Sequence, residues 1–280
     1  DRAAARLRER GARVTLVAGG SASETTDLLH GAVEARPDAV VVAGGDGTVR
    51  LAAQALRGTG VPLGVVPAGT GNDLATHLGL RRADPEAAAD VVLAGHRRRI
   101  DLARVTDSRG AITHYATVLA CGFDARVNDR ANAMRWPRGG SRYTLALLRE
   151  FVALHADRLR VTLHLPDGGV HVLDEQLLIA AVGNSRSYGG GIPVCPDADL
   201  GDGLLEVAVV APVSRLRLLR LLPRLYAGTH AAADEVTIVR ARAVELDAAD
   251  AAAYADGDLI GPLPLRVDAD PAALEVFVAP

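Results

Sequence analysis

Apolar residues in the first hundred positions follow two alternating patterns. Short continuous apolar runs over 39–43 and 61–66 are typical of strands buried on both faces, and a further short strand is predicted over 13–18. Helical spacing of apolar residues predicts helices over 2–10, 24–35, 49–56, 73–78 and 84–94. This alternation of strands and helices predicts a parallel sheet with helices on both of its faces.

Strand-like segments dominate after about residue 100. The pattern predicts strands over 100–105, 113–120, 160–165, 176–182, 204–210, 235–239, 243–246, 263–267 and 274–278, with helices near 141–155 and 214–226. Turn sequences such as Pro166-Asp167-Gly168-Gly169 separate some of these strands. We therefore expect an α/β domain over residues 1–100 and a β-rich, mostly antiparallel domain over residues 101–280.

Composition narrows the chemistry that this chain of 280 residues can perform. All 31 basic residues are arginine, so the chain has no Walker-A lysine, no protein-kinase strand lysine and no Schiff-base lysine. Its two cysteines cannot form a disulfide framework and favour a reducing compartment. A net charge of −3 gives no general attraction to nucleic acid, and no apolar run is long enough to predict a transmembrane segment.

The strongest chemical signal is the run Gly44-Gly45-Asp46-Gly47-Thr48, which follows the predicted strand 39–43 directly. Glycines let backbone N–H groups approach a ligand closely, and the helix that follows adds unpaired N–H groups with positive dipole character. Together these features can bind phosphate without lysine. Asp46 repels phosphate, so we expect it to bind Mg²⁺ or to accept a proton. The alternative is a tight turn that binds no ligand.

A second run, Gly69-Thr70-Gly71-Asn72-Asp73, repeats this arrangement after the predicted strand 61–66. Because the carboxyl ends of neighbouring parallel strands lie close together, both loops can face one crevice. Thr70 can donate to a phosphate oxygen, and Asp73 either faces a metal ion or only caps its helix. Neither loop matches the dinucleotide pattern G-x-G-x-x-G.

These paired loops resemble the diacylglycerol kinase catalytic-domain family, which includes bacterial diacylglycerol kinases and the sphingosine and ceramide kinases. Later segments resemble further family landmarks in the same order, namely 122–125, 182–184, 189–191, 196–205 and 254–258. The resemblance implies an α/β nucleotide-binding domain with a parallel sheet, similar to NAD kinase and diacylglycerol kinase, followed by a β-rich antiparallel sandwich domain. It also implies transfer of the γ-phosphoryl group of ATP to a lipid hydroxyl, with diacylglycerol as the first candidate acceptor.

The resemblance implies a role for each matching residue. The positions that contact ATP are Gly44, Gly45, Asp46, Gly47, Thr48, Gly69, Thr70, Gly71 and Asn72. The acids expected near a catalytic Mg²⁺ are Asp46, Asp73 and Asp101. The family accepts the substrate proton with the glutamate of a D-G-E sequence, and this chain has Asp256-Gly257-Asp258 instead. We assign Asp258 as the proton acceptor, one methylene shorter, and Asp256 as a supporting acid. The alternative is an exposed acidic turn.

A structural Mg²⁺ is also expected from the resemblance. Its ligands would be the Asp202 carboxylate and the backbone carbonyls of Asp199 and Leu204, since a tight acid-and-glycine turn suits a cation that prefers oxygen ligands. A plain Asp-Gly turn without a metal is the alternative.

The chain also departs from the family pattern. It begins at Asp1 inside a helical pattern, without the family's first strand and N-P-x-x-G phosphate loop, so we expect residues to be missing before it. Arg50 and Leu51 stand where many members have Asn-Glu.

The lipid side of the reaction is harder to identify from sequence. The only tryptophan, Trp136, lies among Arg135, Arg138 and Arg142, a patch that can rest on an anionic membrane or simply be a solvated face. We expect a cytoplasmic protein, peripheral at the inner membrane surface, with a lipid substrate and no nucleic-acid partner, and we leave a homodimer open. The rival hypotheses are a kinase for a soluble substrate such as NAD and a non-catalytic lipid-binding protein.

Overall fold

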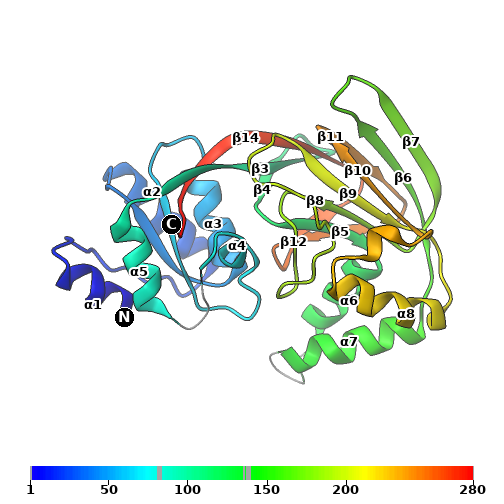
Figure 1. The fold of residues 1–280 in the computed structure, drawn as a ribbon, viewed down its shortest axis with the longest axis horizontal. Coiled ribbons are helices and arrows are strands. Elements are labelled where there is room, and N and C mark those ends of the chain that lie inside the picture. The colour runs from blue at the N-terminus through cyan, green and yellow to red at the C-terminus, as the bar shows by residue number, and fades with distance from the viewer. Residues whose placement is uncertain (1, 81–83, 135, 137–139, 280) are drawn as a thin grey trace.

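The computed structural model describes residues 2–80, 84–134, 136 and 140–279 (Figure 1). The N-terminal part is built from two short strands and the helices around them. Its elements are α1 (Arg2–Glu9), α2 (Ala22–Glu34), β1 (Val40–Gly44), α3 (Asp46–Leu56), β2 (Leu63–Pro67), α4 (Asp73–His77) and α5 (Pro85–Ala94). β1 and β2 pair in parallel with Gly44 opposite Pro67, so the two glycine loops leave the sheet at the same edge.

Capping residues set where these helices begin. Ser21 accepts a hydrogen bond from the Glu24 N–H at the start of α2. Asp84 accepts one from the Ala87 N–H at the start of α5, where Pro85 occupies the first turn. Buried apolar residues of α2, α3, α4 and the two strands form one core with Ile100 and Leu102. This core fixes α3 and α4, which follow the two glycine loops.

The C-terminal part is a sandwich of two sheets. The strands are β3 (Arg97–Asp107), β4 (Ile112–Tyr115), β5 (Val118–Gly122), β6 (Asp157–His164), β7 (Val170–Leu177), β8 (Ile179–Gly183), β9 (Leu205–Val210), β10 (Val236–Ala241), β11 (Ala243–Asp247), β12 (Ala252–Ala255), β13 (Asp258–Pro262) and β14 (Leu265–Phe277). The sheet of six described strands has the order β10-β9-β8-β5-β12-β13 and is antiparallel throughout. Its buried residues pack against β3, β6, β11 and β14 to form the largest described core.

One sheet runs through both parts of the molecule. Its main path is β1-β2-β14-β11-β6-β7, with β3 beside β14 and β4 beside β3. β14 pairs with β3 over nearly its whole length and reaches β2 where Val276 lies opposite Leu63. The end of the chain therefore belongs to the same sheet as β1 and β2. Both this sheet and strand β3 extend across residue 100, where the sequence predicted the boundary between two domains.

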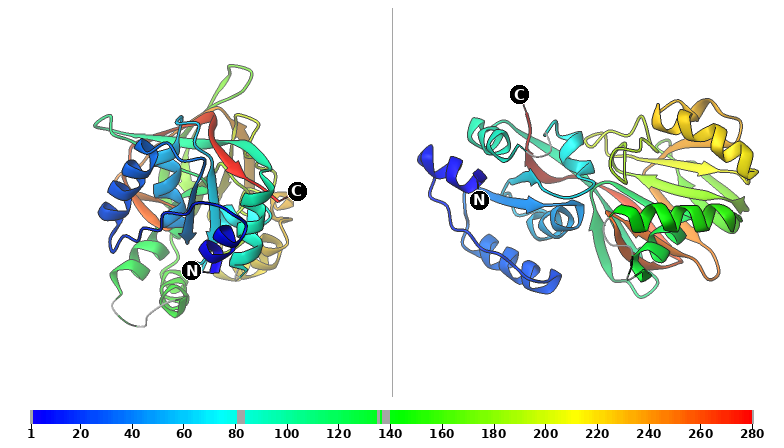
Figure 2. Two further views of the ribbon diagram at one scale, coloured as in Figure 1. Left: turned by 90° about the vertical axis from the view of Figure 1, so that its left-hand side faces the viewer. Right: turned by 90° about the horizontal axis from the view of Figure 1, so that it is seen from below.

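Three helices pack against one face of the six-stranded sheet. They are α6 (Phe123–Ala133), α7 (Gly140–Val152) and α8 (Arg215–Tyr226), and the short helix η1 (His230–Ala232) follows α8. Phe123, Leu178 and Leu218 form the buried centre of their contact. The view from below shows α7 and α8 in front of the sheet (Figure 2).

Several predicted elements differ from those observed. The predicted strand 13–18 is wrong, because residues 12–19 form neither helix nor strand and Leu16 and Val17 are exposed. The predicted strand 113–120 is divided into β4 and β5. The segments 263–267 and 274–278 belong to one strand, β14, which is irregular between Asp270 and Leu274. Helix α6 was not predicted, because its apolar residues are few.

Candidate active site

The two glycine loops touch each other through their backbones. The Ala68 N–H donates to the Gly44 carbonyl over 2.9 Å. A Cβ atom on Gly69 would lie 2.3 Å from the Cα of Gly45, a separation that no side chain tolerates. Glycine is therefore required for this contact, whether or not a ligand binds. The parallel pairing of β1 and β2 brings the loops together, as the sequence predicted.

Asp46 links the first loop to the second. Its Oδ2 accepts a hydrogen bond from the Asn72 N–H and its Oδ1 one from the Asp73 N–H, both over 2.8 Å. Asn72 is left-handed at φ 64°, and its side chain exchanges two hydrogen bonds with the backbone of Gly69. Burial and the nearby Asp73 carboxylate raise the pKa of Asp46. Asp46 thus holds the second loop in shape.

Asp73 reaches the other part of the molecule. Its carboxylate accepts hydrogen bonds from the Gly191 N–H at 2.7 Å and the Gly190 N–H at 3.0 Å, with the Ser187 hydroxyl at 3.3 Å. The side chain is buried. The structure therefore does not favour the alternative in which Asp73 only caps its own helix. It connects the second glycine loop to the glycine-rich segment 189–191.

Asp258 approaches the first glycine loop from the C-terminal part. It begins β13, and its Oδ2 accepts a hydrogen bond from Arg50 Nη2 over 2.8 Å. A Cβ atom on Gly47 would lie 3.4 Å from the same oxygen. The Asp258 side chain is 49% exposed and that of Arg50 is 15% exposed. Asp258 is 208 residues away from Arg50 in sequence, yet its carboxylate lies beside Gly47 in the first turn of α3 and is half exposed to solvent.

Asp256 lies just behind Asp258 in the β12–β13 turn. It accepts hydrogen bonds from the Ala116 and Thr117 N–H groups, both at 3.1 Å, and from the Thr117 hydroxyl. Burial raises the pKa of Asp256 to about 6, with a smaller contribution from Asp46 that Arg50 opposes. Three hydrogen bonds from residues 116 and 117 thus hold the buried Asp256 carboxylate in place.

Asp101 does not join this group. Its Oδ2 accepts from the Gly203 N–H and its Oδ1 from the Ala272 N–H, each over 2.7 Å, and the residue is buried. Among the described residues, no three acidic, histidine or cysteine side chains are arranged to share a metal ion. The expected cluster of Asp46, Asp73 and Asp101 is therefore not formed, because backbone N–H groups of two distant segments hold Asp101 in a structural role.

Asp46 and Asp73 alone suit a divalent cation. A Cβ atom on Gly71 would lie 2.4 Å from Asp46 Oδ2 and 3.2 Å from Asp73 Oδ2, so the two carboxylates converge on this glycine. The negative charge of Asp73 contributes to the raised pKa of Asp46, and a cation between them would relieve that repulsion. Mg²⁺ in phosphoryl-transfer sites is commonly held by one or two carboxylates together with the substrate phosphates.

The segment 199–204, where a structural metal is expected, is a tight turn whose acids also contact arginines. Asp199 Oδ1 accepts from the Gly201 N–H and pairs with Arg98, while Asp202 Oδ1 accepts from the Leu204 N–H and Oδ2 lies 3.4 Å from Arg240 Nη2. The expected ligands were the Asp202 carboxylate and the backbone carbonyls of Asp199 and Leu204, and these contacts do not decide between that metal site and a plain Asp-Gly turn. The structural Mg²⁺ therefore stays a prediction.

The other residues that the sequence assigned to ATP binding lie in or beside the two glycine loops. Thr48 packs against Gly44, because a Cβ atom on that glycine would lie 2.6 Å from the Thr48 side chain. Gly69, Thr70 and Gly71 lie between β2 and α4. The sequence did not identify Thr117 or the pairing of Arg50 with Asp258. The unusual Arg50 was the one available signal, and nothing local marks Thr117.

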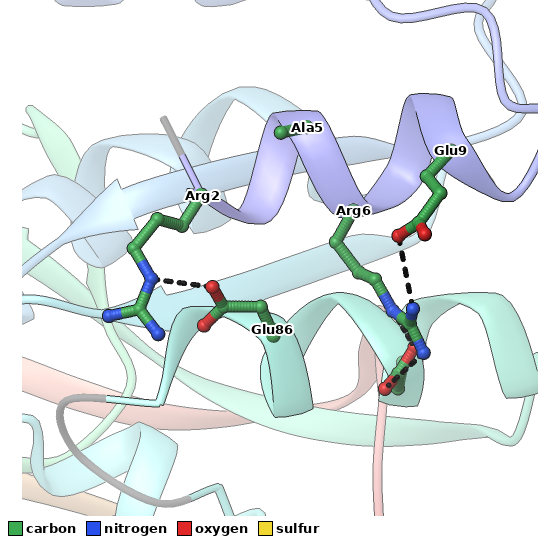
Figure 3. A pocket seen from close by; sticks show the side chains of 6 residues that line it. Arg2, Ala5, Arg6, Glu9 and Glu86 are labelled. Atoms are coloured by element: carbon green, nitrogen blue, oxygen red, sulfur yellow. Dashed lines mark hydrogen bonds and ion pairs between the residues drawn. The ribbon is translucent and has the colours of Figure 1, made fainter.

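A shallow pocket elsewhere on the surface is unsuited to this chemistry. It lies between α1 and α5 and is lined by Arg2, Ala5, Arg6, Glu9, Glu86 and Asp90 (Figure 3). Its charges pair with each other, with Arg2 on Glu86 and Arg6 on Asp90 and Glu9. We therefore interpret it as the joint between two helices.

Comparisons with known proteins show what the chain is similar to. Residues 1–105 match the family model of the Diacylglycerol kinase catalytic domain, and residues 117–278 match the YegS C-terminal NAD kinase beta sandwich-like domain. The chain is 47% identical over 275 residues to a diacylglycerol kinase of Mycobacterium tuberculosis, covering 98% of this chain and 88% of that protein. It is 32% identical over 258 residues to a "Probable lipid kinase YegS-like" protein of Pectobacterium atrosepticum, covering 89% of this chain and 81% of that protein.

The fold has also been seen in crystals. A diacylglycerol kinase structure from Bacillus anthracis superimposes with a TM-score of 0.75 at 20% identity, covering 98% of this chain and 89% of that one. In the described residues, none of the helices has the length and apolar character needed to cross a bilayer. From the matched domains and the similarity over nearly its whole length, the chain belongs to the diacylglycerol kinase family and is a lipid kinase.

Proposed function

We propose that this lipid kinase transfers the γ-phosphoryl group of ATP to the free hydroxyl of diacylglycerol. The observation that carries the proposal is the position of Asp258 next to Gly47 of the first glycine loop, where a Cβ atom on Gly47 would lie 3.4 Å from Asp258 Oδ2. A proton acceptor and a phosphate-binding loop are then adjacent, which phosphoryl transfer to an alcohol requires. The relative from Mycobacterium tuberculosis, named a diacylglycerol kinase, supports the choice of acceptor.

The two glycine loops would bind the triphosphate. Gly45 and Gly47 expose backbone N–H groups at the start of α3, and the helix dipole adds to their attraction for phosphate. Thr48 and Thr70 can donate hydroxyl hydrogen bonds. Asp46 and Asp73 would hold Mg²⁺. When bound, this ion would neutralise negative charge on the phosphates.

Asp258 would accept the proton of the attacking hydroxyl. In the transfer step the lipid oxygen forms a bond to the γ-phosphorus, the bond from that phosphorus to the bridging oxygen breaks, and ADP leaves. The hydroxyl proton passes to the Asp258 carboxylate. A positioned base of this kind contributes about 10²–10⁴-fold in rate. Arg50 holds the Asp258 carboxylate at 2.8 Å, and Asp256 anchors the turn that presents it.

The reaction would take place at the inner surface of the cytoplasmic membrane, where ATP is available and the lipid is embedded. Radiolabelled ATP with a panel of acceptors tests the proposal. We expect labelled product from diacylglycerol and at least a tenfold fall in kcat for Asp258→Asn with ATP binding little changed. Label on NAD but on none of the lipids, or wild-type turnover by Asp258→Asn, would contradict it.

A further inference from the structure

The helical layer on the six-stranded sheet leaves a set of apolar side chains exposed. These residues, which we call the helical face, are Trp136, Leu147, Leu148, Val152, Leu216, Leu219 and Tyr226. They make up more than half of the large exposed apolar side chains in the described part of the chain. Their exposure ranges from 43% at Leu147 to 80% at Trp136. A concentration of this kind marks an interaction surface.

The helices α7 and α8 form one continuous layer. Arg215 in the first turn of α8 donates to the Phe151 carbonyl at 3.2 Å and to the Val152 carbonyl at 2.6 Å, at the end of α7. Both helices run along the lower side of the molecule in Figure 1, and both lie in front of the sheet when it is seen from below (Figure 2). Each helix buries one side, with Ala146 in α7 and Leu218 in α8, and leaves its apolar stripe in water.

Arginine outnumbers acid in these two helices, and one of the arginines, Arg217, is paired with Glu235 beside α8. The arginines of α7 and α8 are Arg142, Arg149, Arg215, Arg217, Arg220 and Arg224. The one acid in these two helices, Glu150, is buried and paired with Arg130 and Arg126. Arg149 and Arg220 have no ion pair among the described residues. This excess is local, because the whole chain carries a net charge of −3.

We propose that the helical face docks on a bilayer that contains anionic lipids. Helices with an apolar stripe, flanking arginines, and tryptophan or tyrosine lie in the plane of the membrane interface. Each arginine near an anionic surface contributes about 1 kcal/mol. An anionic lipid surface would supply the charge that Arg149 and Arg220 lack among the described residues. The identification of the partner as a bilayer rests on the proposed function.

The position of this face suits delivery of a lipid to the acids. The Tyr254 hydroxyl on β12 donates to Asp129 on α6 over 2.9 Å. β12 leads directly into the turn that carries Asp256 and Asp258. A hydrogen bond thus connects α6 of the helical layer to β12, the strand that precedes the proposed proton acceptor Asp258. Of the patch proposed from sequence, Trp136 is exposed and Arg142 packs over the Tyr143 ring at 5.1 Å, whereas Arg135 and Arg138 lie outside the described residues.

Cosedimentation with vesicles tests the docking surface without any turnover. The test variant is Leu148→Glu with Val152→Glu. The matched control is Val170→Glu with Val172→Glu, two residues of similar exposure on β7. On vesicles of phosphatidylcholine and phosphatidylglycerol we expect the test variant to bind at least about tenfold more weakly and the control to bind like wild type. Arg149→Glu with Arg220→Glu should weaken binding only when phosphatidylglycerol is present.

Three results would overturn the inference. The test variant and the control could lose binding equally, or the test variant could bind like wild type. Light scattering could instead show a wild-type dimer that the test variant dissociates, which would make the face a contact between two copies. Activity on a short-chain, water-soluble diacylglycerol separates this inference from the proposed function. We expect the test variant to retain that activity, and vesicle binding by a chain without kinase activity would refute the proposed function while leaving the docking surface intact.

Discussion

Replacing Arg50 by glutamine removes the cation that holds Asp258. Arg50 Nη2 lies 2.8 Å from Asp258 Oδ2, and the two side chains are 15% and 49% exposed. A pair fully exposed to water contributes about 0–1 kcal/mol, whereas a pair at an effective dielectric constant of about 20 has a Coulomb energy of about 4 kcal/mol. Since half of the Asp258 side chain is in water, we expect a coupling of about 1–2 kcal/mol.

That energy corresponds to a measurable loss of rate. We expect Arg50→Gln to lower kcat about 5–30-fold, with little change in the KM for ATP. The reason is that Asp258 becomes free to leave the position from which we propose that it accepts the proton. Global stability should change little, because the buried Arg50 Nε has no hydrogen-bond partner among the described residues and glutamine removes this unpaired donor. Lysine at this position keeps the charge and should lose less.

The assay is a double-mutant cycle on labelled phosphoryl transfer. If Arg50 acts through Asp258, then Arg50→Gln should have no further effect in an Asp258→Asn background. Losses that multiply in the double variant would show that Arg50 acts independently of Asp258. A rise in the KM for ATP with kcat intact would instead assign Arg50 to phosphate binding. Either result would refute the positioning role.

Three further changes test the architecture of the site. Asp101→Asn should lower the free energy of unfolding by about 2–3 kcal/mol in urea denaturation, because one of two charge-assisted hydrogen bonds is lost, and it should leave the Mg²⁺ dependence of activity unchanged. Gly69→Ala should lower stability by about 1–3 kcal/mol and weaken ATP binding in calorimetry, since its Cβ would lie 2.3 Å from the Gly45 Cα, whereas Gly31→Ala meets open space and should do neither. For Asp256, burial raises the folded-state pKa from 3.8 to about 6, so its contribution to stability is full below about pH 4 and declines by about 3 kcal/mol as the pH rises through 6. Urea unfolding of wild type and Asp256→Asn across this range should differ in slope, and parallel curves would contradict the raised pKa.

The sequence predicted the frame of the site well, because that frame is local. Each glycine loop is encoded by an apolar strand, a glycine run and a helix start within a short stretch of sequence. The loops therefore meet as predicted, at Gly45 and Gly69.

The roles of the acids depend on partners that no local pattern reveals. Asp73 bonds to N–H groups more than a hundred residues away, and Asp101 bonds to the N–H of Ala272 at the other end of the chain. The family resemblance placed Asp101 among the metal ligands. Only the three-dimensional structure shows that the Ala272 N–H of β14 donates a hydrogen bond to its carboxylate. The prediction of a strand over 13–18 was wrong for a related reason. A strand forms only where a second strand pairs with it, and the apolar pattern of one segment does not show whether such a partner is present.

The most direct test of the central claim is transfer of label from γ-labelled ATP to diacylglycerol by wild type and Asp258→Asn, measured side by side. The structure predicts labelled lipid from wild type, a fall of at least about tenfold in the variant, and unchanged ATP affinity. Equal turnover in the two proteins would show that the acid above the first glycine loop takes no part in the reaction.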